Sequence, residues 1–270
     1  MVKLLSRCVA LFYAAALLLA QPGVHAAEVV DIDTDARFSD QVARDGMYHP
    51  DTFQHTGVYL NQPVTSSKEV VVFVHGAMGH PGNFSDIVRA LDPNRYQAWV
   101  VYYPSGMKVA DAGAMLAQQV TALAREHGIS QVQVFAHSMG GLVGWEMTQN
   151  LFDKLSVKEF ISVATPWNGH WASQLGVMFS FNPVPSWSDL VPNNGQLKKI
   201  WNDERRPQHK LVFALTRDDE SASGDGTISK SSQLSAAMVD RADQVLKLIG
   251  THTSVLHEKS SVNALVALLN

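Results

Sequence analysis

The 270-residue chain has very little cysteine, because its single cysteine, Cys8, lies in an apolar stretch near the N-terminus. If this stretch is cleaved as part of a signal peptide, the mature protein has no disulfide bond, no thiolate nucleophile and no cysteine-bound zinc. A chain of this length can bury a sizeable core without such crosslinks. An exported protein that lacks disulfides is typical of the bacterial periplasm or medium.

Long hydrophobic runs are also missing. Lys3 and Arg7 precede a 13-residue apolar run, which is short for a membrane span, and a small-residue site ending at Ala26 follows. This layout predicts a secretory signal peptide over residues 1–26 and a mature domain over residues 27–270, in a secreted or periplasmic bacterial protein. The alternative is an uncleaved membrane anchor.

An excess of positive charge is absent as well. The chain has 21 Lys and Arg against 25 Asp and Glu, and removal of residues 1–26 leaves 19 against 25, a net charge of −6. Without a basic patch, neither nucleic acid nor an anionic membrane surface is expected as a partner. The hydrophobic fraction of 46% excludes a disordered chain and is that of an ordinary globular domain.

After Lys68 the sequence alternates between β-branched apolar runs and patterns with helical spacing. The apolar runs predict strands over residues 69–74, 97–103, 131–136, 158–164, 210–216 and 244–249. Helices are predicted over residues 83–91, 111–127, 139–152 and 259–269, with Asp111 as an N-cap and Gly128 as a stop. This alternation predicts an α/β fold with a mostly parallel central sheet and helices on both faces.

Two stretches depart from the alternation. Residues 166–209 are too long for a simple connection and too apolar for a linker, which predicts a cap insertion that covers another part of the protein. Its six large aromatic residues are Trp167, Trp171, Phe179, Phe181, Trp187 and Trp201. Residues 27–68 are polar and mixed, with room for an extra strand or two. The aspartates of residues 31–35 look like the start of an EF-hand calcium loop. The sixth and twelfth positions of that loop require glycine and glutamate but hold Ala36 and Val42, so the stretch is interpreted as a solvated loop.

The strand predicted over residues 131–136 runs directly into His-Ser-Met-Gly at residues 137–140 and then into an apolar helix. This is the pattern of a nucleophile elbow, a strand-to-helix turn so tight that small residues must flank it, here Ala136 and Gly140. Ser138 would then stand at the carboxyl edge of the sheet as a nucleophile. The alternative is that Ser138 is merely the N-cap of the helix.

A serine nucleophile also needs hydrogen-bond donors for the oxyanion of its tetrahedral intermediate. The backbone N–H of Met139, at the start of the helix, is one candidate. The loop after the strand over residues 69–74 offers a second, the N–H of Ala77, with Met78 as the alternative. The glycines of this loop do not have the G-x-G-x-x-G spacing of a dinucleotide site, so no nucleotide is predicted there.

At these residues the chain resembles the α/β-hydrolase superfamily, and within it the bacterial lipases and esterases. The resemblance covers about residues 69–270 and rests on the His75-Gly76 loop, the Ala-His-Ser-Met-Gly elbow and the order of the motifs that follow them. A turn that begins at Thr165 also resembles the Thr-Pro-x-x-Gly turn of lipases. It implies an α/β-hydrolase fold with a cap over the active site. It also implies a catalytic order of serine, acid and histidine along the chain.

The resemblance implies Asp225 as the acid, because Asp225 and the three residues after it are similar to the Asp-Gly-x-Val motif of lipases. Asp218 and Asp219 lie closer to the preceding strand and remain alternatives. The same resemblance implies His252 as the base, since it stands just after the last predicted strand, and His257 is the alternative. All of these positions follow Ser138 in the family's order.

Two further histidines, His75 and His137, lie beside these motifs and are expected to pack or to fix loops. Together, the motifs and the resemblance predict a secreted serine hydrolase that cleaves carboxylic esters through an acyl-enzyme. The aromatic cap favours lipid-like or other hydrophobic esters, with Trp167 and Met78 as substrate-binding residues.

No metal or organic cofactor is expected, and calcium is left out because no aspartate follows His252. The expected partner is a small-molecule or lipid ester, with transient contact at a lipid interface. The alternatives are an acyltransferase, a thioesterase or an amidase with the same triad, or a catalytically silent binding protein. The sequence does not indicate an oligomeric state.

Overall fold

The computed structural model describes residues 27–219 and 221–269, so the predicted signal peptide lies outside the described residues. Within these residues a single sheet has eight strands in the order β1-β2-β4-β3-β5-β6-β7-β8. The strands are β1 (Glu28–Val29), β2 (Gly57–Leu60), β3 (Glu69–Val74), β4 (Tyr96–Tyr102), β5 (Gln131–His137), β6 (Ser156–Val163), β7 (Gln208–Leu215) and β8 (Gln244–Ile249). Strands β3 to β8 run parallel, and β2 is antiparallel to β4. The predicted mostly parallel sheet is confirmed.

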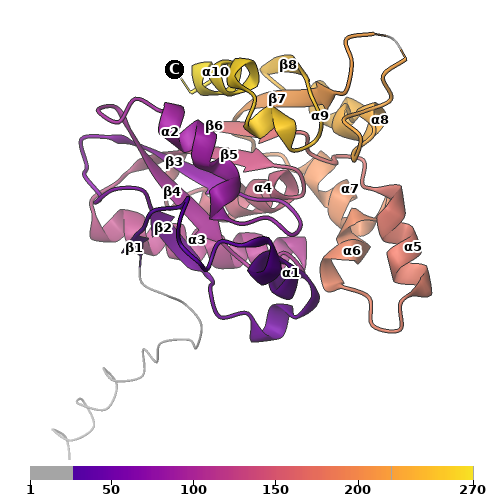
Figure 1. Cartoon of the computed structure of the whole chain (residues 1–270), viewed down its shortest axis with the longest axis horizontal. Coiled ribbons are helices and arrows are strands. Elements are labelled where there is room, and N and C mark those ends of the chain that lie inside the picture. The colour runs from indigo at the N-terminus through magenta and orange to yellow at the C-terminus, as the bar shows by residue number, and fades with distance from the viewer. Residues whose placement is uncertain (1–26, 220, 270) are drawn as a thin grey trace, which may run out of the picture.

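Helices cover both faces of the sheet, as predicted (Figure 1). Along β3, Val70 and Val72 belong to an apolar cluster with helices α3 (Val109–Glu126) and α4 (Gly140–Leu151). Val71 and Phe73, on the other face, belong to a cluster with α2 (Ser85–Ala90) and α10 (Lys259–Ala267). Burial on both faces explains why these strands are nearly continuous apolar runs. The helices flanking the sheet are α2 (Ser85–Ala90), α3 (Val109–Glu126), α4 (Gly140–Leu151), α8 (Lys230–Gln233), α9 (Ala236–Val239) and α10 (Lys259–Ala267).

The start of α3 differs from the prediction. The helix begins at Val109, so Asp111 is not its N-cap, and no side chain of the neighbouring sequence caps it. The N–H of Val109 donates instead to Oδ2 of Asp189, at 2.8 Å, from a helix about 80 residues later. At the other end, Gly128 has a φ of +66°, the left-handed conformation that ends a helix, as predicted.

Residues 27–68 hold β1, β2 and a helix, α1 (Asp40–Tyr48), that the sequence did not predict. Contacts with distant residues hold this helix in place. A Cβ added to Gly46 would lie 3.0 Å from the ring of Phe53, and the carbonyl of Gly46 accepts a hydrogen bond from the N–H of Gly106 at 3.1 Å. Residues 31–35 form a turn before this helix.

The segment between β6 and β7 folds into α5 (Trp171–Phe179), α6 (Pro185–Leu190) and α7 (Gly195–Asn202). Figure 1 shows these helices together at one side of the sheet. The segment is tied to the rest of the protein: the ring of Tyr48 in α1 packs edge-on against Trp187 in α6, and Lys199 in α7 pairs with buried Glu146 in α4 at 2.6 Å. Of the helices in the described residues, none combines the length and apolar character that crossing a bilayer requires.

Candidate active site

Ser138 lies at the turn between β5 and α4, with a φ of +57°, a left-handed conformation that is uncommon for residues other than glycine. The turn is tight because the start of α4 packs directly on the end of β3: a Cβ added to Gly140 would lie 2.4 Å from the carbonyl oxygen of Val74. Ala136, at the other small position, faces Gly144, where an added Cβ would lie 3.2 Å from the Ala136 methyl. The glycine at 144 therefore accommodates alanine at the first small position.

His252 follows β8 and approaches Ser138 from the other side of the turn. Its Nε2 lies 2.8 Å from Oγ of Ser138, and its Nδ1 lies 2.7 Å from Oδ2 of Asp225. The backbone reinforces the second contact, since the N–H of His252 donates to the carbonyl of Asp225 at 2.9 Å. The structure thus brings together the serine, histidine and aspartate that the sequence analysis selected, over more than 110 residues of chain.

Asp225 is fully buried, and protein donors surround its carboxylate. Oδ1 accepts hydrogen bonds from the N–H groups of Thr227 and Ile228, at 2.9 and 2.7 Å. Oδ2 accepts from His252 and, at 3.2 Å, from Nε2 of Gln233. These donors fix the orientation of the carboxylate towards His252. Sequence reasoning missed Gln233, because a lone glutamine in a short helix belongs to no recognisable motif.

The alternative acids and base lie elsewhere. Asp218 pairs with Lys247, and Asp219 accepts hydrogen bonds from Ser221. His257 is exposed and contacts Asp86 through Nδ1 at 2.8 Å. In this structure, the aspartate that contacts the histidine beside Ser138 is Asp225.

The two selected backbone donors flank Ser138. In the described part of the chain, the N–H groups of Ala77 and Met139 donate to no other protein group, so both are available to a ligand oxygen. Met78, the alternative donor, is engaged: its N–H donates to Oγ of Ser105 at 2.9 Å. Ser105 is a second residue that the sequence analysis missed, since it reaches the loop only through the fold.

The histidines beside the motifs hold the loops in place, as the sequence suggested. Nδ1 of His75 lies 2.9 Å from the carbonyl of Gly76, and its ring stacks on Tyr103 with centroids 4.3 Å apart. His137 donates from Nε2 to the carbonyl of His252 at 2.8 Å. Burial lowers the pKa of His75 and of His137 to about 3, so both rings are neutral at physiological pH.

Two cavities open at Ser138. The larger, about 310 Å³, is mostly apolar and is lined from α1, α5, α6 and the loop after β3 (residues 75–80, the candidate oxyanion loop). Its lining residues include Met47, Met78, Pro166, Ala172, Leu190 and Ile228. The smaller, about 190 Å³, is more polar and lies between the oxyanion loop and the segment after β8. Met78, which the sequence analysis assigned to substrate binding, lines both cavities.

Comparison with known proteins places this architecture in a family. A sequence model described as the alpha/beta hydrolase fold matches residues 69–258, well over half of the chain. The chain belongs to the α/β-hydrolase family. No curated protein sequence matches it.

Solved structures that resemble this hydrolase-family member include three bacterial and archaeal proteins. The mature lipase BlEst2 of Bacillus licheniformis is 17% identical, with a TM-score of 0.58 over 79% of this chain and 98% of the lipase. The monoacylglycerol lipase of Paleococcus ferrophilus is 14% identical, with a TM-score of 0.56 over 78% and 98% of the two chains. The product of the Listeria innocua gene lin2722 is 14% identical, with a TM-score of 0.58 over 75% and 94%. At these identities the likeness concerns the fold.

One assignment needs correction in this α/β-hydrolase. Trp167 was expected to contact substrate, but its side chain is fully buried and does not line the cavity beside Ser138. It packs edge-on against Trp145, with ring centroids 5.9 Å apart, and its carbonyl accepts from the indole N–H of Trp201 at 2.8 Å. The aromatic residue therefore supports the base of the insertion, and sequence alone could not distinguish the two roles.

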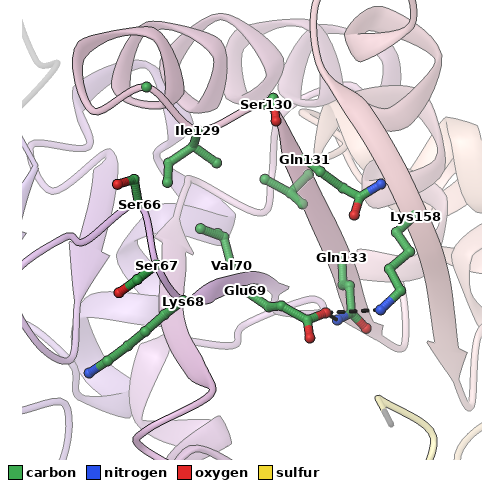
Figure 2. A pocket seen from close by; sticks show the side chains of 12 residues that line it. Ser66, Ser67, Lys68, Glu69, Val70, Ile129, Ser130, Gln131, Gln133 and Lys158 are labelled. Carbon is green, nitrogen blue, oxygen red and sulfur yellow. Dashed lines mark hydrogen bonds and ion pairs between the residues drawn. The ribbon is translucent and has the colours of Figure 1, made fainter.

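A further cavity of about 190 Å³ lies at the amino ends of β3 and β5, the opposite edge of the sheet from Ser138 (Figure 2). There the carboxylate of Glu69 accepts hydrogen bonds from Gln133 and Lys158, both at 2.9 Å, as Figure 2 shows. These groups join three neighbouring strands. None of these groups reaches the elbow, so this cavity is separate from the candidate site at the carboxyl ends of the strands.

Proposed function

We propose that this α/β-hydrolase cleaves carboxylic esters with an apolar acyl group, using Ser138 as the nucleophile, His252 as the base and Asp225 as the acid. The observation that carries the proposal is the continuous contact from Ser138 Oγ through the His252 ring to a fully buried Asp225, beside an apolar cavity. A binding protein would have no use for this ordered set of groups.

The proposed reaction has two halves. Nε2 of His252 accepts the proton of Ser138 as Oγ attacks the ester carbonyl, and the N–H groups of Ala77 and Met139 stabilise the resulting oxyanion. The intermediate collapses, the C–O bond to the alcohol breaks, and His252 gives its proton to the departing oxygen. Water, deprotonated by His252, then attacks the acyl-enzyme and releases the acid and free Ser138. None of these steps uses a metal or an organic cofactor.

The larger cavity supports an apolar acyl group as the preferred one. Its walls include three methionines, a leucine and an isoleucine, which favour burial of hydrocarbon over polar groups. A volume of about 310 Å³ exceeds the needs of an acetyl group. Lipid-like or other hydrophobic esters are therefore the proposed substrate class.

A series of p-nitrophenyl esters from acetate to palmitate tests this proposal, with Ser138→Ala in parallel. Turnover that rises with chain length and vanishes in the variant is the expected result. A maximum at acetate would keep the serine mechanism and reject the lipid-like class. Folded protein with no turnover of any ester would reject ester hydrolysis, in favour of thioesters, amides, acyl transfer or binding.

We also propose transient contact with lipid aggregates through α5 and the loop after it. This helix lines the apolar cavity with one face and exposes Trp171 and Met178, each by about two thirds, on the other. Phe179 and Phe181 extend the exposed apolar surface. A matched test is the binding of Ser138→Ala to neutral detergent micelles, with and without Phe179→Ser and Phe181→Ser. Equal binding with and without the phenylalanines would reject the contact.

Export is proposed from the layout of residues 1–26. Expression of the full chain in a bacterium should yield a periplasmic or secreted protein whose first residue is Ala27. N-terminal sequencing of the purified protein checks this. A protein that retains residues 1–26 in the membrane fraction would support an uncleaved anchor instead.

A further inference from the structure

The two cavities that meet at Ser138 differ in chemistry, and α1 contributes to both. Met47, near the end of α1, lines the apolar cavity, and Asp40, its first residue, lines the polar one. This helix lies before residues 69–258, where the family match is found. Its contribution to the site is therefore a property of this chain and is not implied by membership of the family.

The position of the base decides which half of an ester each cavity can hold. His252 lines the polar cavity and is not among the residues around the apolar one. In the proposed reaction, the departing alcohol oxygen must receive its proton from Nε2 of His252. The alcohol therefore leaves on the side of the polar cavity, and the acyl group occupies the apolar cavity on the other side of Ser138.

Polar groups line the cavity on the alcohol side. Thr253 offers a hydroxyl, and His257 offers its second ring nitrogen, since its Nδ1 is held by Asp86. Asp40 adds a carboxylate that is about 90% exposed at the cavity's edge. These groups can exchange hydrogen bonds with hydroxyls of a small alcohol.

The charge of Asp40 has no cationic partner in the described residues. Its ion-pair contact is with Nε2 of His80 at 3.5 Å, and burial lowers the pKa of His80, so the ring is neutral at pH 7. A carboxylate in this position attracts a positive group on the alcohol and repels a negative one. The carboxylate can also accept a hydrogen bond from a neutral hydroxyl group.

We propose that the polar cavity binds the alcohol half of the substrate, and that the carboxylate of Asp40 selects small alcohols that are cationic or neutral and hydroxyl-bearing over anionic ones. This inference rests on the proposed ester hydrolysis. It names the alcohol, whereas the proposed function concerns the acyl group and the mechanism.

Three esters of one acyl group test the selection: the octanoyl esters of choline, of ethylene glycol and of glycolate, whose two-carbon alcohols are cationic, neutral and anionic. The measured quantity is the ratio of kcat/KM for the choline ester to kcat/KM for the glycolate ester. Intrinsic reactivity of each ester cancels when this ratio is compared between variants. The variants are Asp40→Asn and Asp40→Lys. The control is Asp240→Lys, which makes the same charge change at an exposed residue of neither cavity.

The expected changes follow from the charge at residue 40. Two unit charges about 6 Å apart in a water-like dielectric change a rate by about threefold, so loss of the carboxylate lowers the ratio by about tenfold at low salt. Asp40→Lys lowers it by about a further tenfold, and added salt reduces both effects. Asp240→Lys leaves the ratio unchanged. Thermal melts establish that each variant is folded. If Asp40→Lys does not fold, the comparison of wild type with Asp40→Asn is sufficient to test the inference.

The inference is overturned if the ratio in wild type and in both Asp40 variants agrees within twofold while the esters are hydrolysed. It is also overturned if Asp240→Lys shifts the ratio as much as Asp40→Lys, since the effect would then come from net charge. Failure of the proposed function has a different signature, because none of the three esters would be hydrolysed by folded wild-type protein.

Discussion

Three histidines are buried among the residues that the structure describes, and they make the stability of the protein depend on pH in a calculable way. Burial lowers the pKa of His75, His137 and His209 to about 3, from 6.5 in an exposed histidine. The folded protein keeps these rings neutral, whereas the unfolded chain protonates them below pH 6.5. The free energy of unfolding is therefore not reduced by these histidines above pH 6.5, and it falls as the pH decreases from 6.5 towards 3.

The loss can be separated from that of the carboxylates. Between pH 6.5 and 5, carboxyl groups of ordinary pKa stay mostly ionised, whereas each buried histidine lowers the free energy of unfolding by about 1.36 kcal/mol per pH unit. At pH 5 the loss is about 2 kcal/mol for one histidine and about 6 kcal/mol for three. A total stability of about 5–15 kcal/mol would be reduced severely. Urea denaturation at pH 7 and at pH 5 measures this difference.

His209 provides the matched variant, because it lies away from the catalytic residues, with its Nε2 2.8 Å from Oγ of Ser162. His209→Gln removes one titrating group and keeps a hydrogen-bonding side chain. The variant carries its own constant cost at both pH values, but its loss between pH 7 and pH 5 should be smaller than that of wild type by about 2 kcal/mol. Equal losses in the two proteins, or a wild type equally stable at both pH values, would refute the reasoning.

Three further substitutions test the site and its support. Asp225→Asn keeps the shape of the acid but removes its charge, and kcat for a p-nitrophenyl ester should fall by about 10⁴-fold; a fall below tenfold would contradict the assigned role. Gln233→Leu removes a buried amide bonded to Asp225, and should lower the free energy of unfolding by about 2–3 kcal/mol in urea. Gly140→Ala places a methyl 2.4 Å from the carbonyl of Val74 and should cost about 3 kcal/mol, whereas Gly195→Ala, with open space around the added Cβ, should change stability by less than about 1 kcal/mol. Equal effects of the two alanines would contradict the packing argument.

Local sequence was sufficient where neighbouring residues determine the structure. The strand over residues 69–74 has its predicted bounds, because a continuous apolar run leaves little choice when both faces are covered. The strand over residues 244–249 also has its predicted bounds, although it lies at the edge of the sheet and most of its residues are exposed or partly exposed. The elbow was recognisable from five residues, since its tight turn restricts side-chain size directly at Gly140. The structure places Ser138 and His252 within hydrogen-bonding distance, as the order of motifs along the chain led us to expect.

Long-range contacts account for what the sequence did not indicate. The cap of α3 comes from Asp189, about 80 residues away, so no local pattern could fix the first residue of that helix. The helix α1 depends on contacts at Gly46, a residue that normally disfavours helices. Trp167 is a large aromatic residue of a kind that often contacts substrate. Its packing against Trp145 instead shows that it is part of the core. In each case the deciding partner is distant in sequence.

The proposed hydrolysis requires Ser138 to be a nucleophile that its contact with His252 activates. The decisive experiment is intact-protein mass spectrometry after treatment with a fluorophosphonate, followed by peptide mapping, with Ser138→Ala as the control. We expect one adduct per chain, on the peptide that contains Ser138, and no adduct on the folded variant. An unlabelled, folded wild-type protein, or a variant labelled as completely as wild type, would contradict the account.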